Sequence, residues 1–187
     1  MQLEIPTLGF IAWSGTGKTT LICELLPLLR ARGIRVGVIK HTHHNVEFDT
    51  PGKDSYRLRR SGADQMLVTS ANRWALFGDR RNREPDLDIA CELARMNTDE
   101  LDLVLVESFR SAPIPKIELH RTEMGKPLIY PDDRSVIAVA SNNELGIASP
   151  LTQLNLNDPP AIASYIELQI VEFGRNATDK PSATKNQ

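Results

Sequence analysis

The stretch Ala12–Thr20, AWSGTGKTT, constrains this chain more than any other segment. It departs from the phosphate-loop pattern G-x-x-x-x-G-K-[ST] only at Ala12, which stands in place of the first glycine. The apolar run Leu8–Trp13 comes before the loop, and a helical pattern of leucines follows from Lys18. Strand, loop and helix therefore come in the order in which backbone N–H groups and a helix N-terminus converge on one anion. Ala12 ends the strand, where a methyl group is tolerated at negative φ.

Each part of this loop has an expected role toward a nucleoside triphosphate. Gly15 and Gly17 let the backbone wrap around the phosphates, Lys18 supplies charge to the β and γ oxygens, and the Thr19 hydroxyl is placed for Mg²⁺. The alternative is a strand–loop–helix turn that merely contains Gly-Lys-Thr. We predict that the nucleotide contacts are Ser14, Gly15, Thr16, Gly17, Lys18, Thr19 and Thr20.

Apolar runs rich in β-forming residues alternate with helical patterns along the rest of the chain. This alternation predicts an α/β fold of the P-loop NTPase type, a largely parallel twisted sheet with helices on both faces. The further strands expected are Ile34–Lys40, QMLVTS and WALF (which together fit a hairpin), Leu103–Val106, KIELHR and VIAVAS. The helices expected are Lys18–Arg32, Ser55–Ser61 capped by Asp54, PDLDIACELARM, and one opened by Asp158 and Pro159. We predict one nucleotide-binding domain over 1–173 and a disordered tail over 174–187, which is poor in apolar residues.

A carboxylate follows the central strand in the segment LDLVLVESFR. Four apolar residues, Leu103–Val106, lead directly into Glu107, an arrangement like the Walker B strand. Glu107 is therefore predicted to hold Mg²⁺ together with Thr19, or to polarise an attacking water. Alone, this pattern is often only a strand terminus. Asp102 begins the same strand and so lies at the opposite edge of the sheet.

The histidine-rich segment KHTHHN follows the second strand, at the carboxyl edge where α/β sheets bind ligands. His41 and His43 share one side of an extended chain. Three interpretations stay open: a metal site, because imidazole suits Zn, Ni and Fe, a contact to an anion or substrate beside the nucleotide, or a solvated polar loop. Lys53, next to the start of a predicted helix, is a further candidate for an anion contact.

Composition narrows the class of partner and the compartment. The net charge is −2, from 22 basic and 24 acidic residues, so no basic excess favours a nucleic acid. No apolar run approaches the roughly 18 residues of a membrane helix, and no signal peptide is evident. Cys23 and Cys91 fit buried thiols in a reducing compartment. We therefore expect a cytoplasmic protein that binds neither nucleic acid nor membrane.

Six segments together resemble one family closely. They run in order from about Leu8 to Ser141, as AWSGTGKTT, IKHTHH, PGKDSYRLRRSGA, RWAL, LDLVLVESFR and VIAVAS, and they look like the MobB family of molybdopterin-guanine dinucleotide biosynthesis adaptors. The resemblance implies a dimeric GTP-binding protein that uses Mg²⁺ and hydrolyses GTP weakly at most. It also implies a partner, the molybdenum cofactor guanylyltransferase, which joins GMP to molybdopterin. Lys40, His41 and His43 would then face the pterin phosphate of molybdopterin or the partner enzyme.

Two segments depart from the pattern of that family, ESFR and the residue after VIAVAS. In ESFR, Arg110 stands where the family commonly has lysine and keeps the positive charge with a different geometry. Ser108 stands where the family commonly has glycine, and its side chain restricts how the segment closes on a γ-phosphate. Asn142 follows VIAVAS, where the family commonly has aspartate. A carboxylate accepts from both N1–H and N2–H of guanine, whereas an amide has one acceptor oxygen. Asn142 is thus a candidate base contact with a weaker preference for guanine.

Three other functions are compatible with the residues. A small-molecule kinase would need an acceptor pocket and a lid, for which Asp79–Glu84, DRRNRE, is the arginine-rich candidate. A metal-delivery GTPase would use the histidines of His41–His44. A binding module whose phosphate loop is vestigial would bind no nucleotide at all.

Overall fold

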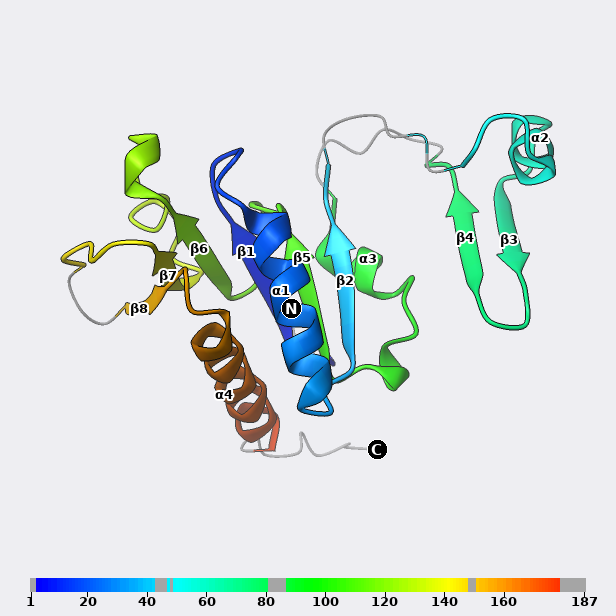
Figure 1. Cartoon of the computed structure of the whole chain (residues 1–187). Helices are drawn as coiled ribbons and strands as arrows, with labels where there is room; N and C mark the ends of the chain where they lie inside the picture. The colour runs from blue at the N-terminus through cyan, green and yellow to red at the C-terminus, as the bar shows by residue number, and fades with distance from the viewer. Residues whose placement is uncertain (1–2, 43–46, 48, 81–86, 148–150, 179–187) are drawn as a thin grey trace, which may run out of the picture. The chain divides into compact units, whose positions relative to one another are not determined.

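The computed structural model describes residues 3–42, 47, 49–80, 87–147 and 151–178 (Figure 1). The chain divides into two compact units, one of residues 1–41 and 88–187 and one of residues 42–87. One domain over residues 1–173 stays a prediction.

The first unit is built on a six-stranded sheet with the strand order β2-β5-β1-β6-β7-β8, and every neighbouring pair is parallel. The predicted α/β class with a mostly parallel sheet is confirmed. Its strands are β1 (Thr7–Ile11), β2 (Val36–Lys40), β5 (Leu103–Glu107), β6 (Lys116–His120), β7 (Val136–Ser141) and β8 (Thr152–Asn155). Its helices are α1 (Lys18–Ala31), α3 (Ile89–Leu93), α4 (Pro159–Thr178) and the 3-10 turns η1 (Thr98–Glu100) and η2 (Thr122–Met124).

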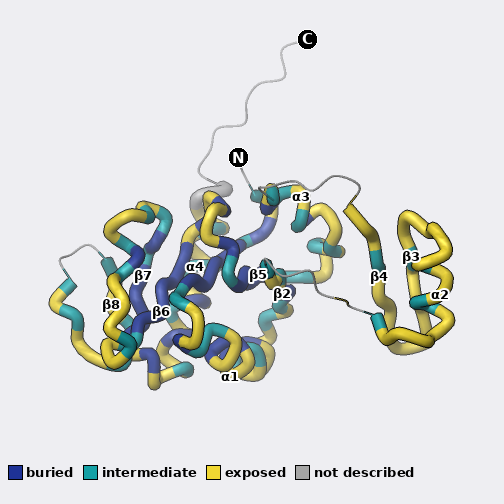
Figure 2. The backbone as a smooth tube through the Cα atoms, turned by 90° about the horizontal axis from the view of Figure 1, so that it is seen from above, coloured by how far each residue is buried: buried dark blue, intermediate teal, exposed yellow. Residues whose placement is uncertain are grey.

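The central strands are buried along their whole length, as expected for a parallel sheet covered on both faces. Helices α1 and α4 lie side by side over one face (Figure 1), and the core between them and the strands is dark in Figure 2. That core includes Phe10, Leu25, Leu105 and Ile162. On the other face, Gly37 of β2 lets Met96 and Leu101 pack against the backbone, because a Cβ there would lie only 2.7 Å from each.

The second unit contains α2 (Asp54–Arg60) and a hairpin of β3 (Gln65–Thr69) and β4 (Trp74–Gly78), which pair antiparallel. The predicted hairpin is confirmed, and Figure 2 shows that it is mostly exposed. The predicted cap of α2 is wrong by one position, because Lys53 is the N-cap and Asp54 is the first helical residue. A carboxylate in the first turn is favoured by the helix dipole much as one at the cap is, so the sequence does not separate the two positions.

The remaining boundaries differ from the predicted ones in several places. The helix predicted over PDLDIACELARM is only five residues long, Ile89–Leu93, because Asp88 is its N-cap and accepts the N–H of Ala90 at 3.0 Å. Strand β1 ends at Ile11 and not at Trp13, since the loop begins there.

Helix α4 is capped as expected, since Asp158 Oδ1 accepts the N–H of Ala161 at 3.0 Å, but the helix continues past Gly174 to Thr178. A disordered tail stays a prediction for residues 179–187, outside the described residues. Strand β8 was not predicted, because TQLN is polar and mostly exposed at the edge of the sheet. The predicted burial of Cys23 and Cys91 is wrong, because each lies on the exposed side of its helix, α1 or α3. In the described part of the chain, no helix is long and apolar enough to cross a bilayer.

Candidate phosphate-loop site

The loop between β1 and α1 has the backbone of an anion cradle. Gly15 and Gly17 adopt left-handed φ values of 83° and 102°, which glycine reaches without the steric cost of a Cβ. Thr16 is buried, and its hydroxyl donates to the Trp13 carbonyl at 2.8 Å. Gly17 is the N-cap of α1 and has no side chain to accept from the first helical N–H groups. These groups therefore point toward whatever the loop encloses.

Lys18 curls back over this loop. Its ammonium donates to the carbonyls of Ala12 and Trp13, at 3.2 and 3.4 Å. Burial lowers the pKa of Lys18, while the nearby charge of Glu107 acts in the opposite direction. A partly desolvated cation that donates to two neutral carbonyls gains strongly from an anion placed in the loop.

Thr19, Glu107 and Lys40 meet on one side of the loop. The Thr19 hydroxyl donates to Glu107 Oε1 at 2.6 Å, and Lys40 Nζ lies 3.1 Å from Glu107 Oε2. The sheet produces this cluster, because β5 lies between β1 and β2 and the register pairs Glu107 with Phe10 and with Lys40. Glu107 is only 6% exposed. Hydroxyl and carboxylate oxygens are the donors that Mg²⁺ prefers, so these residues fit the metal of a nucleotide complex.

His41 is tied to the segment that follows β5. Its backbone N–H donates to the Glu107 carbonyl at 3.0 Å, and its Nδ1 lies 3.3 Å from the Ser108 carbonyl. Its ring packs on Phe109, with centroids 4.9 Å apart. His41 therefore belongs to the same cluster, whereas His43 lies outside the described residues and Lys53 is an exposed residue of the second unit. No group of three or more metal-ligating side chains occurs among the residues that the structure describes.

Ser108 adopts φ 65° and is the only described non-glycine residue with a positive φ. Its N–H donates to the Phe10 carbonyl at 3.1 Å, so the left-handed turn lets the chain leave β5 while still bonded to β1. Serine thus holds the conformation that glycine adopts more cheaply, at a cost of about 1–2 kcal/mol.

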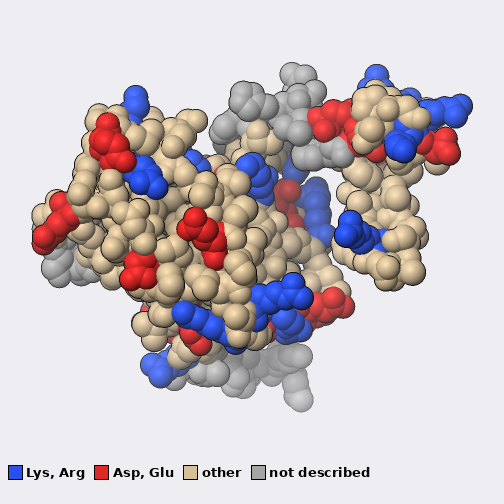
Figure 3. Space-filling view, viewed as in Figure 1, with Lys and Arg blue, Asp and Glu red and all other residues tan. Residues whose placement is uncertain are grey.

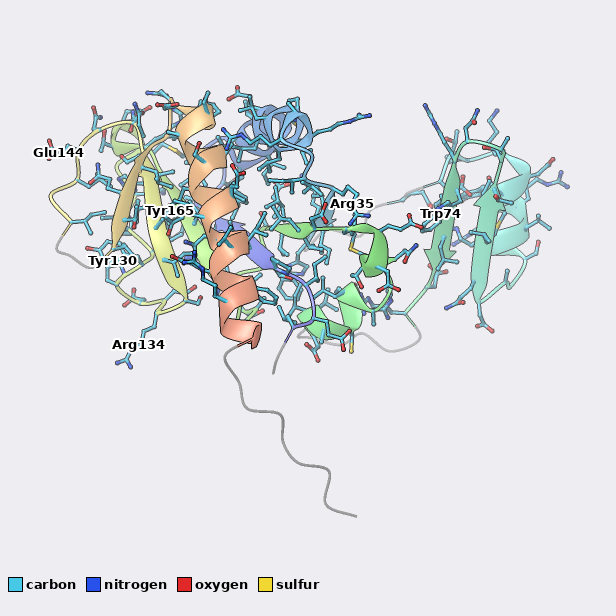
Figure 4. All side chains as sticks on the ribbon, turned by 90° about the horizontal axis from the view of Figure 1, so that it is seen from below. Arg35, Trp74, Tyr130, Arg134, Glu144 and Tyr165 are labelled. Atoms are coloured by element: carbon cyan, nitrogen blue, oxygen red, sulfur yellow. The ribbon has the colours of Figure 1, made fainter. Side chains whose placement is uncertain are left out.

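Asn142 lies directly after β7 and bonds to η2 through both ends of its amide. Its oxygen accepts the N–H of Thr122 at 3.3 Å, and its nitrogen donates to Glu123 Oε2 at 2.6 Å. The pKa of Glu123 is lowered by a bond to its own backbone and next by the bond from Asn142. A hollow of about 370 Å³ opens beside Asn142 and is lined by Ser141, Asn142, Asn143, Glu144, Gln153, Leu154 and Asn155. In Figure 4, Glu144 lies at the outer side of this region.

Sequence reasoning missed the residues that reach the loop from the β6 side. Arg121, placed by the sequence at the end of the strand KIELHR, donates from Nε to the Thr16 carbonyl at 3.0 Å. Lys126, also from the segment after β6, lies over the Trp13 ring, 5.9 Å from its centroid. Arg110, which the sequence already singled out, lies 5.3 Å from the same ring and comes from the segment after β5. A basic residue just after an apolar strand was the available signal. The adjacency of β6 to β1 gives that signal its meaning.

Acidic and basic side chains are interspersed over the face shown in Figure 3, in keeping with the net charge of −2. On that face, the described side chains form no broad basic surface.

Known proteins resemble this chain over the segments that build the site. Residues 7–142 match the family model MobB, molybdopterin guanine dinucleotide synthesis protein B. The molybdopterin-guanine dinucleotide biosynthesis adapter protein of Escherichia coli strain K12 is 50% identical over 163 residues, which cover 87% of this chain and 91% of that protein. The protein of the same name from Haemophilus influenzae is 47% identical over 175 residues, covering 92% and 94%.

Solved structures agree with these relatives. The crystal structure of molybdopterin-guanine biosynthesis protein B (mobB) matches with a TM-score of 0.70 at 27% identity, covering 88% of this chain and 99% of that one. The crystal structure of Bacillus subtilis MobB matches with a TM-score of 0.68 at 25% identity, covering 88% and 98%. The family model spans β1, the phosphate loop, β5 and Asn142, and so the chain that carries this site belongs to the MobB family, the adapters of molybdopterin-guanine dinucleotide biosynthesis.

Proposed function

We propose that this adapter binds GTP with Mg²⁺ at the phosphate loop. We further propose that it assists the molybdenum cofactor guanylyltransferase, the enzyme that attaches GMP to molybdopterin. The observation that supports nucleotide binding best is the pairing of Thr19 with Glu107 beside a loop whose two glycines are left-handed. The backbone of Gly15–Gly17 and the Lys18 ammonium would hold the phosphates.

Mg²⁺ would be held by the hydroxyl of Thr19 and the carboxylate of Glu107. The ion would neutralise phosphate charge, and Lys40 would add a cation beside it. Both oxygens of Glu107 are already engaged, one by Thr19 and one by Lys40. A carboxylate so occupied is poorly placed to activate water, which supports slow hydrolysis at most.

The residues at the two flanks of the loop have proposed roles toward the base and toward the partner. Asn142 would contact the base, with a weaker guanine preference than a carboxylate gives, because it has one acceptor oxygen. Lys40 and His41 would face the pterin phosphate of molybdopterin or the partner enzyme, and His43 and Lys53 keep the same proposed role. We also propose that the protein is a cytoplasmic homodimer.

The test is an equilibrium titration with GTP and with ATP, each with and without Mg²⁺. We expect GTP to bind more tightly than ATP and binding to strengthen with Mg²⁺. Lys18→Ala should abolish binding, whereas Arg30→Ala, which removes an exposed cation from the far end of the same helix, should not. Tighter binding of ATP, with phosphate transfer to a small acceptor, would replace this proposal by a kinase. An absence of nucleotide binding would make the loop a scaffold.

A further inference from the structure

The segment that follows β6 lies directly against the phosphate loop. Arg121 Nε donates to the Thr16 carbonyl at 3.0 Å, and the Thr16 hydroxyl lies 3.5 Å from the Met124 sulfur. A Cβ built on Gly15 would lie 3.7 Å from Met124 Cε. Because β6 pairs with β1 on the side opposite β5, this segment approaches the loop from the flank away from Glu107.

The guanidinium of Arg121 has donors left over at the mouth of the loop. A Cβ built on Gly17, the residue at the N-terminus of α1, would lie 4.0 Å from Arg121 Nη2. Among the described residues, Arg121 forms one ion pair, from Nη1 to Glu123 Oε1 at 3.8 Å, which is longer than a hydrogen bond. An arginine has five N–H donors, and the Thr16 carbonyl uses one of them.

Arg121 stands next to a turn that is tied down from β7. The backbone N–H of Thr122 donates to Asn142 Oδ1 at 3.3 Å, and Asn142 Nδ2 donates to Glu123 Oε2 at 2.6 Å. Asn143 Nδ2 adds a bond of 2.5 Å to the Thr122 hydroxyl. The Arg121 side chain is itself two-thirds buried, with 34% exposed. A side chain held in this way loses little rotational freedom when it binds an anion.

We propose that Arg121 contacts the polyphosphate of the bound nucleotide and so closes the side of the loop opposite Thr19 and Glu107. The planar guanidinium suits phosphate oxygens, to which it makes charge-assisted hydrogen bonds. The inference rests on the proposed binding of GTP. It adds a phosphate-binding residue, Arg121, which lies between β6 and η2. Asn142 then has a second role, as a positioning residue for the turn that carries Arg121.

The test compares two substitutions that separate charge from loop anchoring. Arg121→Gln keeps an N–H donor for the Thr16 carbonyl but loses the charge, whereas Arg121→Lys keeps the charge but loses the planar group. If Arg121 touches phosphate, Arg121→Gln should weaken GTP–Mg²⁺ binding about 10–100-fold, and Arg121→Lys about 3–10-fold. The control is Arg134→Gln, which removes an exposed arginine that points away from the ribbon in Figure 4 and should change the affinity less than about twofold.

The order of the GTP–Mg²⁺ affinities of the two variants decides between phosphate contact and loop anchoring. Affinity of Arg121→Gln equal to that of the wild type, or greater than that of Arg121→Lys, would assign Arg121 to loop anchoring alone and overturn the inference. If Arg121→Gln does not fold, as judged by thermal unfolding without nucleotide, wild-type affinity in Arg121→Lys overturns it. Loss of GTP binding in Lys18→Ala alone leaves the proposed function standing without this inference. A wild type that binds no GTP removes both.

Discussion

Ser108 shows how one backbone angle is selected by its surroundings. The residue must turn left-handed for its N–H to reach Phe10 while His41 bonds to the carbonyls of Glu107 and Ser108. We predict the stability order Ser108→Gly, wild type, Ser108→Val. Glycine relieves about 1–2 kcal/mol of strain and loses part of that gain to its greater freedom in the unfolded chain, and valine adds strain. Urea unfolding measures the order, and a valine variant as stable as the wild type would contradict it.

The role of Glu107 also depends on a single side chain, because its two carboxylate oxygens contact Thr19 and Lys40. We predict that Glu107→Gln lowers Mg²⁺-dependent GTP turnover by about 10–100-fold, since an amide does not bind Mg²⁺ as a carboxylate does. Asp102→Asn is the matched control, a change of the same kind at the other end of β5. Equal turnover in wild type and Glu107→Gln would remove Glu107 from the proposed mechanism.

The pH dependence of GTP binding should report Lys18. Burial lowers the pKa of Lys18 from 10.5. A triphosphate prefers the protonated ammonium, so the wild-type affinity should fall as pH rises through that lowered pKa, before 10.5 is reached. Lys18→Arg carries a group that stays charged throughout and serves as the reference, each protein being scaled to its own affinity at neutral pH. Parallel pH profiles for the two proteins would show that Lys18 does not carry the effect.

At the scale of elements, β6 places a carboxylate inside the sheet to hold the segment before β7. Glu118 is fully buried and accepts the N–H groups of Ile129 and Tyr130, each at 2.8 Å. Glu118→Gln keeps one acceptor and turns an N–H₂ group toward the other donor. We predict a loss of about 1–3 kcal/mol in the free energy of unfolding at neutral pH, measured by urea unfolding. A loss below the error of that measurement would mean that the segment rearranges.

The same carboxylate gives a pH dependence of stability. Burial raises the pKa of Glu118 above 4.5, although the two backbone bonds act to lower it. Between 4.5 and the raised value, the folded state binds more protons than the unfolded state. The contribution of Glu118 to stability therefore falls as pH rises through this window. The difference in unfolding free energy between wild type and Glu118→Gln, followed across the window, should show this slope, and a difference that does not vary with pH would exclude it.

The local sequence pattern predicts those elements whose defining residues lie close together in the chain. The Gly15–Thr19 loop, the strand that ends in Glu107 and the hairpin of β3 and β4 are of this kind. Arg121 was missed because its approach to Thr16 depends on β6 lying next to β1, a neighbour relation that periodicity does not reveal. The two bonds of Asn142 to η2 likewise depend on β7 lying beside β6. Polar β8 gave no pattern to read.

At the scale of the whole molecule, the prediction concerns the oligomeric state. The chain has a mass of 20.8 kDa, and we predict that it exists in solution as a dimer of twice that mass. Light scattering coupled to size-exclusion chromatography measures the mass directly, over a dilution series. A mass of one chain at every concentration would remove the homodimer from the proposed function.

The strand order also has a consequence for how the protein is made. Strand β1, which leads into the phosphate loop, pairs Thr7 with Val104 on one side and Gly9 with Lys116 on the other. The ribosome therefore synthesises β1 and α1 long before β5 and β6, the neighbours of β1. Until then, the apolar faces of β1 and α1 are not covered by the sheet. The long segment between β1 and β5 must form a closed loop before Glu107 can pair with Phe10 of β1. The candidate site is thus completed only after synthesis has passed Asn142, the last described residue that is proposed to contact the nucleotide.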